Sequence, residues 1–139
     1  MKVSGRPQAT AARGSPPRVL LCDDSAELRA LFRSAIEGGG DVAVVGEVGD
    51  GDEAVRLAAE HQPEVVVLDL EMPGPLPEAL LTALRRAAPG AGLVTFSGHD
   101  PAAVAGAAVS EIALHLPKTT DLAVAARAVR DLGRARTAS

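Results

Sequence analysis

Aromatic residues are almost missing from this sequence, which holds Phe32 and Phe96 but no tryptophan and no tyrosine. Hydrophobic residues nevertheless make up 47% of the chain, and most of them are alanine, valine and leucine. An apolar fraction of that size is typical of a globular domain. We therefore expect an aliphatic core built from small side chains.

Cysteine, positive charge and long apolar runs are also scarce. The single cysteine, Cys22, excludes an internal disulfide bond and fits a reducing cytoplasm. The net charge of −4 offers no basic surface for nucleic acid or for an anionic membrane. No apolar stretch approaches the roughly 20 residues of a membrane span, and Met1–Gly14 lacks the apolar centre of a signal peptide. We therefore predict a cytoplasmic protein that binds neither nucleic acid nor membrane.

The length of 139 residues suits a single domain. Residues 1–17 are rich in glycine and proline and carry three basic residues but no acidic one. Such a segment buries too little apolar surface to become ordered. We predict a disordered N-terminal tail over residues 1–17, one domain over 18–133 and a short C-terminal tail over 134–139.

Short β-branched runs alternate with segments of helical periodicity inside this domain. Runs such as Val65–Leu68 are apolar throughout, as expected for strands that are covered on both faces. The segments between the runs repeat apolar residues three and four positions apart, and Val104, Ala107 and Ala108 mark the fourth predicted helix. Strands are predicted at Val19–Cys22, Val42–Val48, Val65–Asp69, Leu93–Phe96 and Ile112–Leu116. This alternation predicts an α/β fold with a five-stranded parallel sheet and five helices.

Polar residues follow four of the predicted strands. In parallel α/β sheets, ligands bind beyond the carboxyl ends of the strands. The first strand runs into Asp23 and Asp24, and the third ends in Asp69. The fourth strand is followed by Ser97 and the fifth by Lys118. We therefore expect these five side chains at one edge of the sheet.

The chemistry of this set points to phosphate. Three carboxylates at one edge repel one another unless a cation lies among them. Oxygen ligands suit a hard divalent ion such as Mg²⁺. A lysine supplies positive charge for a phosphoryl oxygen. Together, metal, carboxylate nucleophile, cation and hydroxyl are the parts needed to transfer a phosphoryl group to a carboxylate.

The same segments resemble the receiver domains of response regulators in two-component signalling. Leu20–Ser25 resembles the acidic pair of that family, and Glu64–Gly74 resembles its phosphoacceptor segment. Val94–Gly98 is similar to the strand that carries the switch hydroxyl, and Leu116–Lys118 is similar to the lysine segment. The resemblance covers about residues 18–133 and implies a flavodoxin-like, doubly wound sheet with the strand order 2-1-3-4-5.

The separations between the matched residues also agree with the family. Asp69 follows Asp24 by 45 residues, Ser97 follows Asp69 by 28, and Lys118 follows Ser97 by 21. The resemblance implies that Asp69 accepts phosphate from a sensor histidine kinase or a phosphotransfer protein. It also implies that Lys118 pairs with the aspartyl phosphate and that Ser97 moves to bond it.

Further roles follow from the same resemblance. Mg²⁺ would be bound by Asp23, Asp24, Asp69 and the backbone carbonyl of Glu71. His115, three residues before the lysine, would change rotamer as the switch residue. The fourth helix, fifth strand and fifth helix would then bind a downstream effector or a second copy of the chain. A receiver phosphorylates and dephosphorylates itself and is not a multiple-turnover enzyme.

Several residues depart from the family pattern. His115 stands where the family usually has tyrosine or phenylalanine, so we expect a weaker or pH-dependent switch. Pro117 precedes the lysine and Thr119 follows it, although many relatives have a proline after the lysine. Such a proline fits only near an edge or at the end of a strand. Glu71 adds a fourth carboxylate that either tunes the site or is a solvated loop acid.

Two other functions remain open from the sequence. The chain could be the N-terminal receiver part of a DNA-binding transcriptional regulator. It could also be an aspartyl-phosphate hydrolase, which needs an acid–base residue two positions after the nucleophile, where Glu71 stands. Multiple turnover on a phosphomonoester would distinguish the hydrolase from a receiver.

Overall fold

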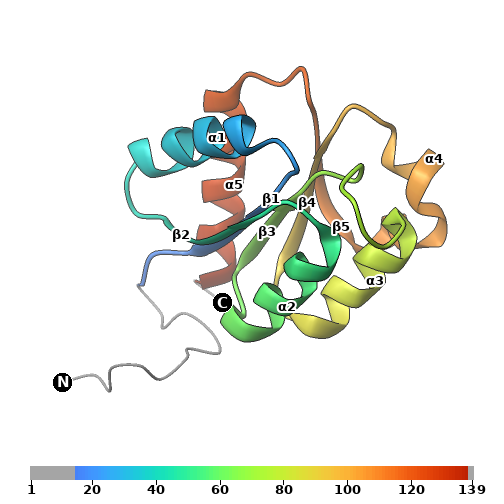
Figure 1. The fold of residues 1–139 in the computed structure, drawn as a ribbon. Helices are drawn as coiled ribbons and strands as arrows, with labels where there is room; N and C mark the ends of the chain where they lie inside the picture. Colours follow the sequence, from blue (N-terminus) through green and yellow to red (C-terminus); the bar gives the residue numbers. More distant parts are fainter. Residues whose placement is uncertain (1–14, 138–139) are drawn as a thin grey trace.

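The computed structural model describes residues 15–137. Its strands are β1 (Arg18–Cys22), β2 (Ala43–Val48), β3 (Val65–Leu68), β4 (Gly92–Ser97) and β5 (Ile112–Pro117). Its α-helices are α1 (Ala26–Gly38), α2 (Gly51–His61), α3 (Pro77–Ala87), α4 (Pro101–Ala105) and α5 (Leu122–Thr137). The strands form one parallel sheet in the order β2-β1-β3-β4-β5, with α1 and α5 on one face and the other helices on the opposite face (Figure 1). The predicted fold class and strand order are confirmed.

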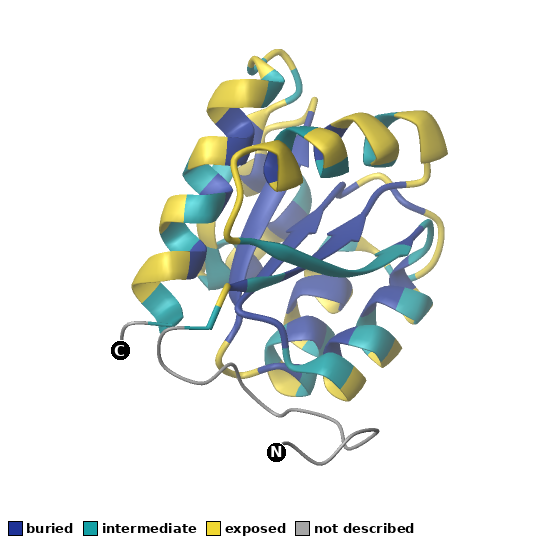
Figure 2. Cartoon of the chain, turned by 90° about the vertical axis from the view of Figure 1, so that its left-hand side faces the viewer, coloured by how far each residue is buried: buried dark blue, intermediate teal, exposed yellow. Residues whose placement is uncertain are grey.

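Successive residues of each central strand enter two separate cores. In β3, Val66 and Leu68 pack with α2 and α3, whereas Val65 and Val67 pack with α1 and α5. All four side chains are buried, which explains why this run is apolar throughout. Figure 2 shows the central strands as buried and the edge strand β2 as only partly buried.

The two phenylalanines meet in the core between the sheet and helices α1 and α5. The ring centroids of Phe32 and Phe96 lie 5.2 Å apart with an interplanar angle of 82°. Aromatic rings favour this edge-to-face arrangement. Most of the other buried apolar side chains are aliphatic, as expected from the composition.

The fourth helix is shorter than predicted. It ends at Ala105, because Gly106 has a φ of +55° and a ψ of −135°, a conformation that a helix cannot contain. A 3-10 helix, η1 (Gly106–Glu111), then leads into β5. Ala107 and Ala108 therefore belong to η1, and the prediction that they continue one α-helix with Val104 is wrong.

The ends of the domain also differ from the predicted boundaries. Helix α5 continues to Thr137, so residues 134–137 are helical and do not form the expected tail. At the other end, Pro17 is buried and its carbonyl accepts a hydrogen bond from the amide of Ala43 at 2.9 Å. The rest of the predicted tails, residues 1–14 and 138–139, lies outside the described residues. Among helices in the described range, none has the length and apolar character that a bilayer crossing requires.

Candidate functional site

The parallel pairing of β1 and β3 brings two acidic segments side by side. Cys22 pairs with Leu68 at the end of the ladder, and the amide of Asp69 donates to the Cys22 carbonyl at 2.9 Å. The amide of Asp23 donates to the carbonyl of Val48 in β2 at 3.0 Å. These main-chain bonds hold Asp23 and Asp69 next to each other just beyond the sheet.

Three carboxylates meet at this point. Asp23, Asp24 and Asp69 each offer an oxygen, and the three oxygens lie within 4.8 Å of one another. Asp23 and Asp69 are 7% and 5% exposed, whereas Asp24 faces solvent. Hard divalent cations prefer oxygen ligands and keep several waters, so a partly open set of carboxylates fits Mg²⁺. The predicted gathering of these three residues is observed.

Main-chain amides hold one oxygen of each buried carboxylate. The amide of Ser25 donates to Asp23 Oδ1 at 2.9 Å, and the amide of Glu71 donates to Asp69 Oδ1 at 2.9 Å. Both bonds span two residues, so the loops that follow β1 and β3 orient their own acidic side chains. The Oδ2 atoms of Asp23 and Asp69 are therefore directed to a common partner.

That common partner is Lys118. Its Nζ lies 2.8 Å from Asp23 Oδ2 and 3.3 Å from Asp69 Oδ2, and 5.6 Å from the centroid of the Phe96 ring. Burial by itself lowers the pKa of Lys118, but its hydrogen bonds and charge interactions with the two aspartates outweigh burial and raise that pKa. The lysine therefore keeps its positive charge at neutral pH.

The unusual proline next to the lysine does not displace it. Pro117 is the last residue of the edge strand β5, where a missing ladder donor is tolerated. The amide of Lys118 still donates to the Ser97 carbonyl at 3.1 Å. No cis peptide bond occurs between residues 15 and 137. The lysine thus reaches the acidic cluster although its neighbours differ from the family pattern.

The environment of Asp69 disfavours its charge. Burial is the largest effect and raises the pKa of Asp69, and the neighbouring negative charge of Asp23 acts in the same direction. The amide of Glu71 and the charge of Lys118 oppose this shift without cancelling it. Additional positive charge at this site would therefore be favourable.

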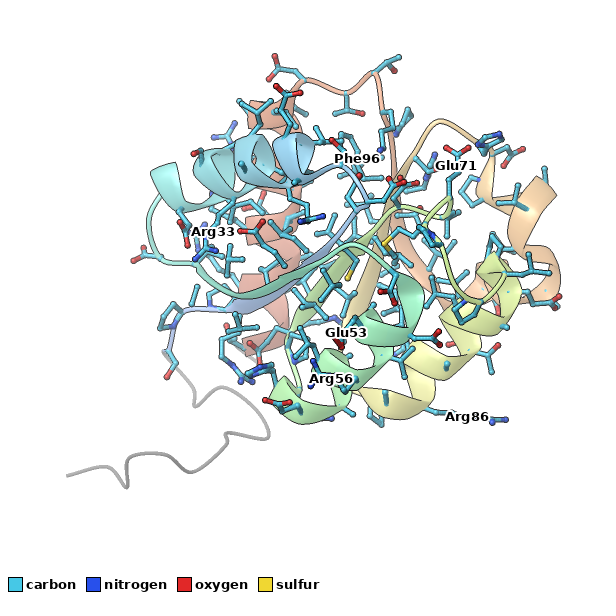
Figure 3. All side chains as sticks on the ribbon, viewed as in Figure 1. Arg33, Glu53, Arg56, Glu71, Arg86 and Phe96 are labelled. Carbon is cyan, nitrogen blue, oxygen red and sulfur yellow. The ribbon has the colours of Figure 1, made fainter. Side chains whose placement is uncertain are left out.

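Ser97 lies at the end of β4 and is 1% exposed. Its Oγ accepts a hydrogen bond from the amide of His99 at 3.2 Å. His99 Nδ1 lies 3.0 Å from Glu71 Oε2, so the loops that follow β3 and β4 are joined beside the acidic cluster. Figure 3 shows Glu71 near the edge where the strands end. No role was predicted for His99, although its position two residues after a strand-end hydroxyl was a usable signal.

His115 is not part of the acidic cluster. Its Nδ1 lies 2.7 Å from the Oγ1 of Thr95, which is fully buried in β4. The two residues are direct neighbours in the parallel pairing of β4 with β5. Thr95 could not be predicted as the partner of His115, because a cross-strand partner depends on register.

Comparisons with known proteins agree on one family. A family model described as response regulator receiver domain matches residues 19–130. The transcriptional regulatory protein PdtaR of Mycobacterium tuberculosis is 38% identical over 96 residues, which are 68% of this chain and 46% of that protein. A protein-glutamate methylesterase/protein-glutamine glutaminase of Maricaulis maris is 40% identical over 91 residues, which are 66% of this chain and 22% of that protein. The chain thus spans less than half the length of these relatives.

Solved structures show the same architecture. The signal receiver domain of the putative response regulator NarL from Mycobacterium tuberculosis superposes with a TM-score of 0.77 at 30% identity. That match covers 86% of this chain and 98% of the other. The response regulator domain of CheB from Thermotoga maritima superposes with a TM-score of 0.73 at 27% identity, covering 88% and 97%.

Proposed function

The chain belongs to the response-regulator receiver domain family, and we propose that it accepts a phosphoryl group on Asp69 from a histidine kinase or a phosphotransfer protein. One observation carries this proposal. The two buried aspartates and Lys118 converge so that the Oδ2 atom of Asp69 lies beside a second carboxylate and a cation. The lysine suits the negative oxygens of an incoming phosphoryl group, and the second carboxylate offers a ligand to a divalent cation.

The transfer exchanges one bond to phosphorus for another. A carboxylate oxygen of Asp69 attacks the phosphorus of a phosphohistidine, the P–N bond breaks, and the imidazole keeps the electron pair and takes up a proton. Lys118 balances charge on the phosphoryl oxygens. The Ser97 hydroxyl oxygen accepts a hydrogen bond from the amide of His99. The hydroxyl hydrogen of Ser97 is therefore available to donate to the phosphoryl group.

The side chains of Asp23, Asp24 and Asp69, with the backbone carbonyl of Glu71, would hold Mg²⁺. When bound, Mg²⁺ neutralises charge on phosphoryl oxygens as they approach the carboxylates. The raised pKa of Asp69 supports this assignment, because a buried carboxylate that is disfavoured as an anion gains from an added cation.

The response to phosphorylation would run from Ser97 to His115. We infer that Ser97 turns toward the phosphoryl group and that His115 leaves the Thr95 hydroxyl to follow it, which changes the surface of α4, β5 and α5. The partner at that surface is an effector protein or a second copy of the chain, in the cytoplasm. The hypothesis of a pH-dependent switch predicts different partner affinity at pH 6 and pH 8, and equal affinity would reject it.

Acetyl phosphate provides the direct test. The full chain, incubated with acetyl phosphate and Mg²⁺, should gain one acid-stable, hydroxylamine-labile phosphoryl group. Asp69→Asn should abolish the signal, and removal of Mg²⁺ should nearly do so. Asp52→Asn changes an exposed carboxylate of α2 and should leave it intact. A phosphoryl group that persists in Asp69→Asn would reject the proposal.

The two relatives differ in the activity of the whole protein, since one is a transcriptional regulatory protein and the other is a methylesterase. We propose only the receiver function for this chain and expect no turnover of small substrates. Sustained hydrolysis of a phosphomonoester, lost in Glu71→Gln, would support the aspartyl-phosphate hydrolase instead.

A further inference from the structure

Arg29 lies beside the acidic cluster but contacts none of its carboxylates. It belongs to α1, and its side chain is 18% exposed. Its Nη1 donates a hydrogen bond to the backbone carbonyl of Asp23. The guanidinium thus reaches back from the first turns of the helix to the peptide that joins Asp23 to Asp24.

The carbonyl of Asp23 is the first one after β1 that makes no hydrogen bond to a neighbouring strand. The amide of Asp23 is paired with Val48, and the preceding carbonyl of Cys22 is paired with Asp69. Because a peptide unit is planar, the direction of the Asp23 carbonyl determines where the Cα atom of Asp24 lies. Arg29 therefore controls the step between the two acidic residues.

Gly49 lies next to the guanidinium and to the Asp23–Asp24 peptide. A Cβ atom placed on Gly49 would lie 3.4 Å from Arg29 Nη1, 3.7 Å from the Cα of Asp24 and 3.8 Å from the carbonyl oxygen of Asp23. Gly49, the residue after β2, is thus a neighbour of both the guanidinium and the Asp23–Asp24 peptide.

An ion pair with Glu47 adds to the hydrogen bond that Arg29 makes with the Asp23 carbonyl. Arg29 Nε lies 3.4 Å from Glu47 Oε1 in β2. Arg33, one turn further along α1, holds the other oxygen of Glu47, with Nη1 at 2.8 Å from Oε2. Figure 3 shows Arg33 between α1 and β2. Arg33 thus shares the partner Glu47 with Arg29 but makes no hydrogen bond to Asp23.

We propose that Arg29 is a positioning residue for the Mg²⁺ site, because it fixes the Asp23–Asp24 peptide and thereby the relative placement of two of the three carboxylates. This inference rests on the proposed function. It assigns a role to a residue that donates no ligand.

The direction in which Mg²⁺ affinity changes when Arg29 is replaced distinguishes a positioning role from a purely electrostatic one. If Arg29 acted only as a positive charge near the cluster, its removal would reduce repulsion and Mg²⁺ would bind more tightly. If Arg29 acts by holding the peptide, its removal loosens Asp24 and Mg²⁺ binds more weakly. Loss of a group that orients metal ligands typically weakens metal binding about tenfold or more.

Calorimetric titration of the full chain with MgCl₂ tests the inference. Arg29→Met keeps most of the apolar stem and should weaken Mg²⁺ binding about tenfold. Arg29→Lys keeps a charged donor and should recover most of the affinity. Arg33→Met is the matched control and should bind Mg²⁺ within about twofold of the wild type. Circular dichroism on each variant establishes that it is folded.

An Arg29→Met variant that is folded and binds Mg²⁺ as tightly as the wild type, or more tightly, would overturn the inference. Weakening of the same size in Arg33→Met would also overturn it, because the effect would then come from the Glu47 ion pairs. Phosphorylation by acetyl phosphate provides the separate readout. In Arg29→Met the rate should fall at low Mg²⁺ and return to that of the wild type at saturating Mg²⁺.

The proposed function fails in a different way. If the wild type were not phosphorylated at saturating Mg²⁺, or if Asp69→Asn were, the proposed function would be rejected whatever Arg29 does. If the wild type bound no Mg²⁺ in calorimetry, the metal site and the role of Arg29 would be rejected together.

Discussion

Replacing Asp69 by asparagine should stabilise the protein when Mg²⁺ is absent. Burial raises the pKa of Asp69, and the charge of Asp23 adds to this shift. The folded protein therefore holds the Asp69 proton more tightly than the unfolded chain does, so that the ionised carboxylate costs stability above the folded-state pKa. Asparagine has nearly the same shape, and its Oδ1 can still accept the amide of Glu71. Its NH₂ group then replaces Oδ2 beside Lys118 and cannot accept from it, so Lys118 keeps only Asp23 as an acceptor.

The structure limits the size of this gain. Asp69 is 5% exposed, but one of its oxygens accepts an amide and the other lies 3.3 Å from Lys118, so part of the cost is already offset. Lys118 keeps Asp23 Oδ2 as a partner at 2.8 Å, so the substitution leaves no unpaired charge, and we expect a gain of about 1 kcal/mol. For a domain of this size that corresponds to a rise in the melting temperature of roughly 4 °C.

The dependence on pH and Mg²⁺ identifies the cause. The advantage of Asp69→Asn should be full at pH 7.5 and should shrink as the pH falls toward 3.8, the ordinary pKa of an aspartate, because the wild-type carboxylate becomes neutral. Mg²⁺ at about 100 times its Kd stabilises a folded protein by about 2.7 kcal/mol. The wild type should gain more from Mg²⁺ than the variant, which has lost a ligand.

Thermal unfolding followed by circular dichroism measures all of these effects, first in EDTA and then in MgCl₂. Asp52→Asn removes an exposed charge in the first turn of α2 and is the matched control. It should lower the melting temperature slightly and not raise it, because an acid near a helix N-terminus is weakly stabilising. A variant that is less stable than the wild type at pH 7.5 in EDTA would refute the reasoning. So would an advantage that does not depend on pH.

Three further outcomes are expected. Lys118→Met should bind Mg²⁺ about tenfold more tightly but accept phosphate more slowly, because a lysine and a divalent cation held in one cluster would repel each other. Weaker Mg²⁺ binding in calorimetry would contradict this. Burial raises the pKa of the Cys22 thiol far above its ordinary range, so Ellman's reagent should react no faster than the protein unfolds, and immediate reaction would count against a buried thiol. Gly106→Ala should lower the free energy of unfolding by about 1–2 kcal/mol in urea titrations, because Gly106 has a positive φ. Gly38→Ala, at a position with open space around the Cα, is the control and should cost nothing.

Much of the fold could be predicted because its signals are local. A strand that is buried on both faces needs an unbroken apolar run, and Val65–Leu68 is such a run. The end of α3 is also a local signal, because Pro89 and Gly90 follow its C-cap residue and both disfavour helix. The break at Gly106 was missed because a glycine between alanines fits a helical pattern, and only the path from α4 to β5 requires its positive φ.

Part of the site could be predicted for the same reason. Asp23, Asp24 and Asp69 each follow a recognisable strand, and parallel strands end at the same edge of a sheet. The position of Lys118 could be anticipated from the strand before it and from its distance along the chain, although Pro117 and Thr119 left the shape of its loop open. The helical residues 134–137 were expected to be a tail, because their composition is polar and their contacts are made with distant segments.

The alternation of strands and helices and the edge at which acidic, hydroxyl and lysine side chains would collect were determined by the sequence itself, because they follow from periodicity and from the residue after each strand. The order of the strands was expected only from the resemblance to receiver domains. Only the tertiary structure decided which side chains touch. The bonds of Arg29 with the Asp23 carbonyl, of His115 with Thr95 and of His99 with Glu71 join separate elements or loops. Such contacts depend on register, on helix orientation and on side-chain reach, and these quantities are set by the packing of the whole domain and by no short segment of it.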